Sequence, residues 1–399
     1  MERKKFIKGF MLGILLTMCV GAVGIKAYDV IQSKERNQGA VTDDFVEKAK
    51  LIERIVDKKF TGEVDKELME SMMYKGLMAS LGDPYSAYYT SEEYEDLNTE
   101  TTGSYKGIGV VMQMHMETGV VKVVRCYETA PGAKAGLQPE DVLVAVNGES
   151  IVGKELSEVV DEIKASKDEI AHLTIARDGE ADYLEFDIPL EEVNIPVVDF
   201  EMLEDQIGYI ALYEFTEQTE PQYLEAFQTL KKQGMERLII DLRGNPGGLL
   251  TSVCDILNDM LPEGLIVYTE DKEGNKEEIK SDGKHKLDMP LAVLVNGNSA
   301  SASEIFAGAI QDYEVGTLVG TTTFGKGIVQ SVIPLSDGSA VKTTTAKYYT
   351  PKGRCIHGTG ITPDVEVELT EGLEQKTTLT HEEDNQLQKA MEVVKSTLK

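Results

Sequence analysis

Two short segments, 296–303 and 323–330, contain residue types that together can perform nucleophilic catalysis. The first, NGNSASAS, places three serines at the start of a predicted helix, with Ser301 in the middle. The second, TFGKGIVQ, places Lys326 between two glycines. A serine hydroxyl attacks a carbonyl group only when a base removes its proton, and a desolvated lysine amine can replace histidine as that base. The candidate pair is therefore Ser301 and Lys326.

The serine segment has two interpretations that its spacing does not separate. The sequence from Ser301 to Glu304 fits a capping box, in which the serine only satisfies helix amides. The same position faces the free N–H groups and the positive dipole end of the helix, which can hold the oxyanion of a tetrahedral intermediate. Ser299 and Ser303 are rival nucleophiles that the spacing does not exclude.

Lys326 also has an ordinary interpretation, as an exposed loop lysine. To act as a base its amine must be neutral, and burial among apolar neighbours such as Phe324, Ile328 and Val329 would lower its pKa toward the working range. Gln330 follows four residues later, so its amide would share a face with Lys326 and orient the amine if this turn is helical. No histidine has a comparable setting.

A glycine-rich turn, DLRGNPGG at 241–248, joins a predicted strand to a predicted helix. It lacks the G-x-G-x-x-G pattern and the Walker lysine, which argues against a nucleotide site. The backbone amide of Gly247 or Gly248 could instead form one half of an oxyanion hole, opposite the amide of Ala302.

A second glycine loop, Gly107-Ile108-Gly109, leads into a predicted strand. Consecutive free amides in such a loop can bind a carboxylate, and an adjacent open strand edge can accept a peptide as an added strand. The loop is therefore a candidate site for a peptide C-terminus.

The elements that must position these groups fall into three regions. Residues 41–97 have helical periodicity, whereas 102–188 contain short alternating strands and one helix at 156–165. From about residue 193 strands alternate with helices, which implies a parallel sheet with helices on its faces. The strands predicted there are 207–212, 238–242, 291–295 and 317–319; the helices begin at 221, 249 and 302; a hairpin, 330–349, and a final helix, 382–398, follow.

The composition excludes several classes of function. A net charge of −29 argues against nucleic-acid binding, which requires basic clusters. The four cysteines and five histidines show no metal-ligand spacing, so we expect neither a metal nor a cofactor.

The N-terminus has the pattern of a membrane signal. Four basic residues among the first eight precede an uncharged run at 9–25, close to the length of a membrane span. The basic flank is expected to stay cytoplasmic, so the chain after Lys26 crosses the membrane. We expect an uncleaved, single-pass anchor in the cell membrane with the catalytic body on the extracytoplasmic side; a cleaved signal, giving a secreted protein, is the alternative.

Seven motifs, in this order, make the chain resemble the C-terminal processing peptidases, or tail-specific proteases, which are bacterial-type Ser–Lys serine peptidases carrying a PDZ domain. One departure is Glu140, which stands where the PDZ pattern usually has glycine. The motifs are GDPYSAYYT at 82–90, YKGIGV at 105–110, APGAKAGLQPEDVLVAVNG at 130–148, DLRGNPGG at 241–248, NSASASEIFAGAIQD at 298–312, TFGKGIVQ at 323–330 and KYYTPKGRCIHGTGITPDV at 347–365.

The resemblance implies a role for each candidate residue. Ser301 would be the nucleophile, Lys326 the general base and Gln330 the residue that orients the lysine. The oxyanion donors would be the amides of Gly247 and Ala302. The PDZ carboxylate loop would consist of Gly107, Ile108 and Gly109.

The resemblance also implies a multidomain α+β fold, a crotonase-like α/β protease core with an inserted PDZ domain, and a homodimer formed through the terminal helices. We expect a membrane anchor or signal at 1–30, a helical region at 31–97, the PDZ domain at 98–188, the peptidase core at 189–373 and a C-terminal helix at 374–399. The expected function is that of a serine endopeptidase that captures the C-terminal tails of proteins and cleaves through an acyl-enzyme. The alternative is an inactive PDZ peptide-binding scaffold.

Overall fold

The computed structural model describes residues 39–373, 376 and 379–396, and the predicted anchor at 1–30 lies outside them. Within the described residues, no helix combines the length and the apolar character that a membrane span requires. The chain divides into two units, 1–74 and 75–399. Helix α2 (Asp43–Lys59) lies in the first unit, where its cap residue Thr42 accepts a hydrogen bond from the Phe45 amide, and α3 (Lys66–Ala79) begins there.

The segment after α3 departs from the helical expectation for 41–97. Residues Ala87–Tyr89 form a strand, β1, and helix α4 (Ser91–Thr102) follows, with a capping box between Thr90 and Glu93. β1 pairs with a strand far along the chain, β18 (Ala340–Tyr349), so it belongs to a sheet of the C-terminal half. Local periodicity could not show this, because the partner strand is about 250 residues away in sequence.

A compact antiparallel domain occupies the middle of the chain. Its sheet has the order β3-β4-β5-β7-β8, with β6 paired to β5, and a buried apolar core that includes Val121, Val159 and Leu173. β2 (Ser104–Gly107) leads into the domain and pairs with the exit strand β9 (Glu191–Asn194). The elements are β3 (Val110–Met114), β4 (Val121–Cys126), α5 (Pro131–Ala135), β5 (Val142–Val146), β6 (Glu149–Ser150), α6 (Leu156–Lys164), β7 (Ile170–Ala176) and β8 (Leu184–Pro189).

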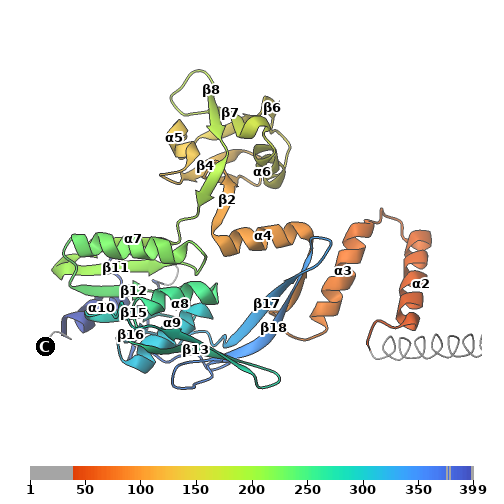
Figure 1. Ribbon diagram of the computed structural model, residues 1–399. Coiled ribbons are helices and arrows are strands. Elements are labelled where there is room, and N and C mark those ends of the chain that lie inside the picture. The colour runs from red at the N-terminus through yellow and green to blue at the C-terminus, as the bar shows by residue number, and fades with distance from the viewer. Residues whose placement is uncertain (1–38, 374–375, 377–378, 397–399) are drawn as a thin grey trace, which may run out of the picture. The chain divides into compact units, whose positions relative to one another are not determined.

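A second sheet, with the order β10-β11-β12-β15-β16-β19, forms the centre of the C-terminal half (Figure 1). All its pairs are parallel except β10–β11, as the alternation of strands and helices predicted. The strands are β10 (Val198–Leu203), β11 (Ile207–Leu212), β12 (Arg237–Asp241), β15 (Leu291–Val295), β16 (Thr317–Gly320) and β19 (Val365–Glu366).

Helices cover both faces of this parallel sheet, because its strands carry apolar side chains on both. Leu238 and Ile240 pack with α7 (Thr219–Lys232), α8 (Leu250–Asn258) and α9 (Ala302–Tyr313). Their neighbour Ile239 points to the opposite face and packs with α10 (Asn385–Ser396), close to the predicted final helix. Near-continuous apolar strands of this kind are typical of sheets buried on both sides.

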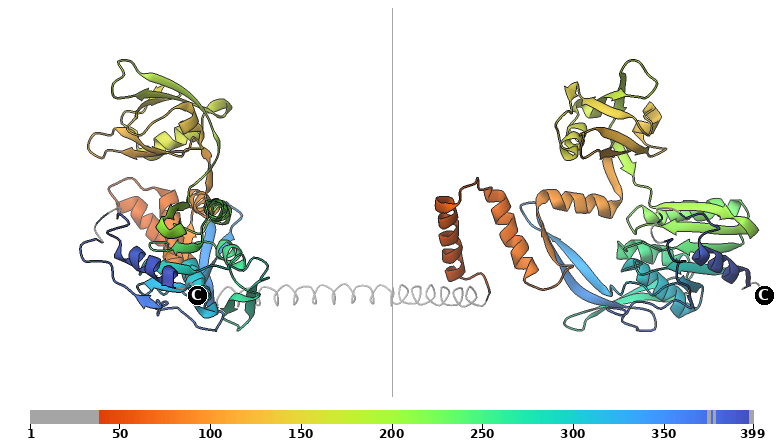
Figure 2. Two further views of the ribbon diagram at one scale, coloured as in Figure 1. Left: turned by 90° about the vertical axis from the view of Figure 1, so that its left-hand side faces the viewer. Right: turned by 180° about the vertical axis from the view of Figure 1, so that it is seen from behind.

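A third sheet contains the long hairpin predicted around Asp337-Gly338, now seen as β17 (Ile328–Pro334) and β18 (Figure 2). β18 also pairs with β1 and with β13 (Gly264–Asp271), which forms a second hairpin with β14 (Lys276–Ser281). The sequence analysis did not predict β13 and β14: β13 is a short apolar run without alternation, and β14 is mostly charged.

Candidate active site

Ser301 is placed at the start of α9 by an unusual backbone. Its φ of 56° and ψ of −114° lie outside the common regions for a residue other than glycine. The Ser301 amide donates to Glu304 Oε2 at 2.9 Å, which is the carboxylate half of a capping box. The Ser301 side chain faces the Glu304 amide as the other half of the box, but its hydroxyl accepts no hydrogen bond of ordinary geometry from that amide. The carboxylate half of the box is therefore the strong one, and Ser301 also lines the neighbouring cleft.

The two rival serines make structural hydrogen bonds instead. Ser299 Oγ donates to the Leu242 carbonyl oxygen at 2.8 Å, and Ser303 Oγ donates to the Asn245 carbonyl oxygen at 3.0 Å. Both side chains are fully buried. Of the three serines only Ser301 lines the cleft described below. The structure therefore separates candidates that spacing could not.

A buried carboxylate joins the serine segment to the lysine segment. Glu304 is fully buried, and its Oε2 accepts hydrogen bonds from the amides of Ser301 (2.9 Å) and Lys326 (2.8 Å). Its Oε1 accepts from the hydroxyl of Thr323 (2.6 Å) and the amide of Gly325 (2.7 Å). Four donors thus satisfy one carboxylate, and one of its oxygens, Oε2, holds the backbone amides of both Ser301 and Lys326.

Tyr348 joins the same two residues from the other side. Its buried hydroxyl lies 2.9 Å from the Ser301 carbonyl oxygen and 2.5 Å from that of Lys326, so one proton serves both acceptors. Burial raises the pKa of Tyr348 well above its usual value, which keeps the hydroxyl protonated as a donor. Sequence reasoning missed Tyr348 and saw in Glu304 only a cap residue. The signal was present in KYYTPKG and in S-x-x-E, but their partners are distant in sequence.

The amine of Lys326 is half-buried beside aromatic and charged groups. Nζ lies 4.8 Å from the ring centroid of Tyr85. Burial lowers the pKa of Lys326, and the positive charge of Lys342 lowers it further, whereas Asp83 and Glu304 act in the opposite direction. Lys326 and Ser301 line one cleft without forming a hydrogen bond between Nζ and Oγ. Catalytic hydrogen bonds are often long in structures without substrate.

Gln330 lines the cleft, but the local structure is not the helical turn considered above. It lies on β17, where it pairs in register with Thr344 just after a bulge at Val329. Its amide nitrogen donates to Thr344 Oγ1 at 3.3 Å. The β-branched pair Ile328-Val329 favours a strand over a helix here.

The glycine turn approaches Ser301 at Gly247. A Cβ atom at Gly247 would lie 2.7 Å from both the Ala300 carbonyl oxygen and Ser301 Cβ, and 2.9 Å from the Ala302 nitrogen. Ala302 is the first residue of α9, so its amide has no acceptor inside the helix. The Gly247 amide donates to Asn245 Oδ1 at 2.8 Å. The two predicted oxyanion donors are therefore close together, but one is engaged in this conformation.

An ion-pair cluster holds the start of the glycine turn at 241–248. The Arg243 guanidinium donates to Asp241, at the end of β12, and to Asp384, with shortest distances of 2.6 and 2.7 Å. Asp384 also accepts from the Leu387 amide in the first turn of α10. The turn that carries Gly247 is thus tied to the C-terminal helix.

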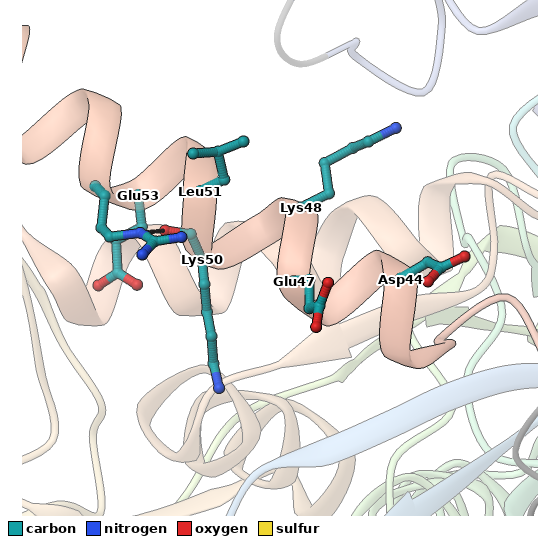
Figure 3. Close-up of a pocket in the computed structure, with 7 residues that line it drawn as sticks. Asp44, Glu47, Lys48, Lys50, Leu51 and Glu53 are labelled. Carbon is teal, nitrogen blue, oxygen red and sulfur yellow. Dashed lines mark hydrogen bonds between the residues drawn. The ribbon is translucent and has the colours of Figure 1, made fainter.

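The cleft that unites these groups has a volume of about 480 Å³. Its apolar lining from Leu249, Ile305 and Ile328 suits a peptide side chain beside the Ser301 hydroxyl. A larger hollow of about 900 Å³ lies along α2, where Figure 3 shows charged side chains such as Glu47 and Lys50 from a single helix. Those residues are mostly exposed and include no nucleophile, as expected of a solvated helix surface.

The predicted carboxylate loop lies in the antiparallel domain. Gly109 has a φ of 71°, and a Cβ there would lie 2.1 Å from the Ala130 side chain, so the loop requires glycine. The ring of Tyr105 lies over Gly107. Glu140, the departure from the PDZ pattern, adopts a φ of 71°, and its carboxylate pairs with Lys122 at 2.8 Å. The turn thus keeps the left-handed conformation that glycine would supply.

The comparisons with known proteins agree on one family. The profile of "Peptidase family S41" matches residues 206–367, and that of "PDZ domain" matches residues 122–177. The chain is 35% identical over 325 residues to a "Probable CtpA-like serine protease" of Staphylococcus epidermidis, covering 81% of this chain and 65% of the relative. It is 34% identical over 329 residues to "Carboxy-terminal processing protease CtpB" of Bacillus subtilis, covering 82% and 68%.

A solved structure, "Photosystem II D1 C-terminal processing protease", is 29% identical, with coverage of 86% of this chain and 92% of the other and a TM-score of 0.47. The chain spans 65% of the length of the staphylococcal relative.

Replacing Glu304 by glutamine should destabilise the fold, because one amide NH₂ would face donors that now share a carboxylate. We expect the free energy of unfolding to fall by about 2–4 kcal/mol, measured by urea denaturation. Glu93→Gln is the matched control: Glu93 holds the same capping-box position on α4 but is partly exposed, so its loss should cost less than about 1 kcal/mol. If the two changes lowered the free energy of unfolding equally, Glu304 would not make the larger contribution to stability that we expect.

Gly247→Ala should displace the serine segment, because the new methyl group meets Ser301 Cβ and the Ala300 carbonyl oxygen. We expect a destabilisation of about 1–3 kcal/mol and loss of Ser301 labelling by a serine-directed fluorophosphonate. Gly244→Ala is the control, since Gly244 also has a positive φ, 75°, but nothing lies within 4 Å of its missing Cβ. This variant should lose only the stability that backbone strain at a positive φ costs, and its Ser301 should still react with the fluorophosphonate.

Proposed function

Because this chain belongs to peptidase family S41, as a serine-type C-terminal processing peptidase, we propose that Ser301 and Lys326 form its catalytic pair. The observation that carries the proposal is the single cleft that Ser301, at the start of α9, and the half-buried Lys326 both line. Burial lowers the pKa of that lysine, which favours the neutral amine that a general base requires.

The proposed reaction proceeds by acyl transfer. Lys326 Nζ takes the proton of Ser301 Oγ as the oxygen attacks the scissile carbonyl carbon, and the amide of Ala302 stabilises the oxyanion. Protonated Lys326 then gives its proton to the leaving amine, and a water molecule hydrolyses the ester. The Gly247 amide becomes the second oxyanion donor if substrate binding releases it from Asn245. Gln330 orients the amine.

We propose that the substrates are C-terminal tails of proteins. A PDZ domain and a protease core suit the binding of peptide or protein substrates. The amides of Gly107, Ile108 and Gly109 would bind the terminal carboxylate of the tail, with the Gly109 amide released from Tyr105. A tail peptide with a free C-terminus should therefore be cleaved with a lower KM than the same peptide ending in an amide.

We further propose that the protein is held in the bacterial cell membrane by its N-terminal segment, with the catalytic body outside the cytoplasm. The uncharged run at 9–25 supports this.

A homodimer is proposed because Phe45, Ile52 and Met72 on α2 and α3 are exposed apolar side chains. Analytical ultracentrifugation of the chain without residues 39–74 should then show monomers.

Ser301→Ala and Lys326→Ala should each lower kcat by at least about a thousandfold on a tail peptide, because the two groups act as one unit. The controls are two changes on the same hairpin, Ser331→Ala at a half-buried position and Lys347→Ala at an exposed one, and both should leave kcat unchanged. Near wild-type cleavage by Ser301→Ala would rule out the assignment. A wild-type protein that binds tails but neither cleaves them nor reacts with a fluorophosphonate would instead be the scaffold.

Lys326→Met should abolish activity and yet stabilise the fold at neutral pH. The pKa of Lys326 is lower in the folded protein than in the unfolded chain. At any pH below the folded-state pKa, the charged lysine therefore reduces the free energy of unfolding. As pH rises from that value to the ordinary value of 10.5, the unfolded state binds more protons, and wild-type stability recovers. Urea denaturation across this range should show the advantage of the variant shrinking with pH; a constant difference would contradict it.

A further inference from the structure

The turn before β1 lies beside Lys326 and Thr344, although the proposed reaction uses none of its residues. Asp83 Oδ2 accepts hydrogen bonds from the hydroxyls of Ser86 (2.6 Å) and Thr344 (2.7 Å), and Asp83 Oδ1 accepts from the Tyr85 amide (3.1 Å). Thr344 Oγ1 in turn accepts from Gln330 Nε2 at 3.3 Å. A continuous chain of hydrogen bonds therefore runs from Asp83 through Thr344 to Gln330.

The direction of this chain is fixed by its charged end. An ionised carboxylate can only accept, and hydrogen bonds from Ser86 and Thr344 hold the pKa of Asp83 below its usual range. Thr344 has one hydroxyl proton, and it donates this proton in its hydrogen bond to Asp83. The Thr344 oxygen is then an acceptor, so Gln330 must present its NH₂ group to it. The carbonyl oxygen of Gln330 is the atom left for another partner.

The orientation of Gln330 decides what it can do for Lys326. A neutral amine that acts as a base must be held by its own N–H groups, so that its lone pair points to the serine. The carbonyl oxygen of Gln330 accepts such an N–H, whereas its NH₂ group would compete for the lone pair. A flipped amide would therefore oppose the reaction that the same side chain supports when correctly oriented.

We propose that Asp83, acting through Thr344, is a positioning residue that fixes the amide of Gln330 with its oxygen toward Lys326. The inference rests on the proposed catalytic roles of Ser301, Lys326 and Gln330. It assigns a function to the GDPYSAYYT segment, which brings Asp83 to Thr344 through the pairing of β1 with β18. The same turn places the Tyr85 ring against Lys326 Nζ.

Thr344→Val is the sharpest test, because it removes the hydroxyl and keeps the shape of the side chain. The kcat per labelled Ser301 should fall about ten- to hundredfold, with KM nearly unchanged, since the loss affects the base rather than substrate binding. Thr344→Ser should restore most of the rate. Thr345→Val is the matched control: the neighbouring hydroxyl is exposed and pairs with Ser331 Oγ at 2.9 Å, away from Asp83 and Gln330, so kcat should not change.

Asp83→Asn adds a readout that structural damage alone would not produce. The charged groups that act on Lys326 are Lys342, Asp83 and Glu304, and Asp83 raises the pKa of the lysine. Removing its charge should therefore move the acidic limb of kcat/KM to lower pH, in addition to lowering kcat. Thr344→Val leaves the charge in place and should not move that limb.

Two outcomes would overturn the inference. One is a wild-type kcat per labelled Ser301 in Thr344→Val, even if less folded protein is recovered. The other is an Asp83→Asn profile that coincides with wild type. Either result together with an inactive Ser301→Ala would leave the proposed function intact, whereas an active Ser301→Ala would remove the basis of both.

Discussion

The geometry of the candidate site depends on one buried carboxylate. Glu304 lies at zero exposure, and burying an unpaired carboxylate would be prohibitive, so its four hydrogen bonds are a condition of folding. Two of the donors are the amides of Ser301 and Lys326. A fold that satisfies Glu304 must therefore bring the serine and the lysine segments together. The site is assembled by the same bonds that let α9 enter the core.

This arrangement has an electrostatic cost for the base. A carboxylate close to Lys326 favours the charged ammonium, and Glu304 and Asp83 both raise the pKa of the lysine. Burial and Lys342 act in the other direction and prevail. Because the negative charge of Glu304 is directed onto four hydrogen-bond donors, its oxygens hold backbone amides rather than the amine. The carboxylate can thus fix the position of the lysine while the amine keeps a lowered pKa.

The sequence predicted the large elements well, because their patterns are local. The alternation of apolar strands and helices predicted the parallel sheet, and 291–295 coincides with β15. Contacts between segments that are distant in the sequence could not be predicted from local patterns. Ser299 and Ser303 could be set aside only when the Leu242 and Asn245 carbonyl oxygens were seen to accept their protons. The role of Tyr348 could not be predicted from its own motif, since its acceptors, the carbonyl oxygens of Ser301 and Lys326, lie on two other segments.

The parallel sheet explains why the site tolerates a strained serine. Successive residues of β12 point to opposite faces: Ile240 packs under α9, and Ile239 packs under α10. Asp241, which ends the strand, binds Arg243, and Arg243 binds Asp384 at the start of α10. The turn that contacts Ser301 is therefore held from the face of the sheet opposite α9. The strained backbone of Ser301, at φ 56°, persists only because both the turn and α9 are held in place. If either could move, the strain would relax and the hydroxyl would change its position.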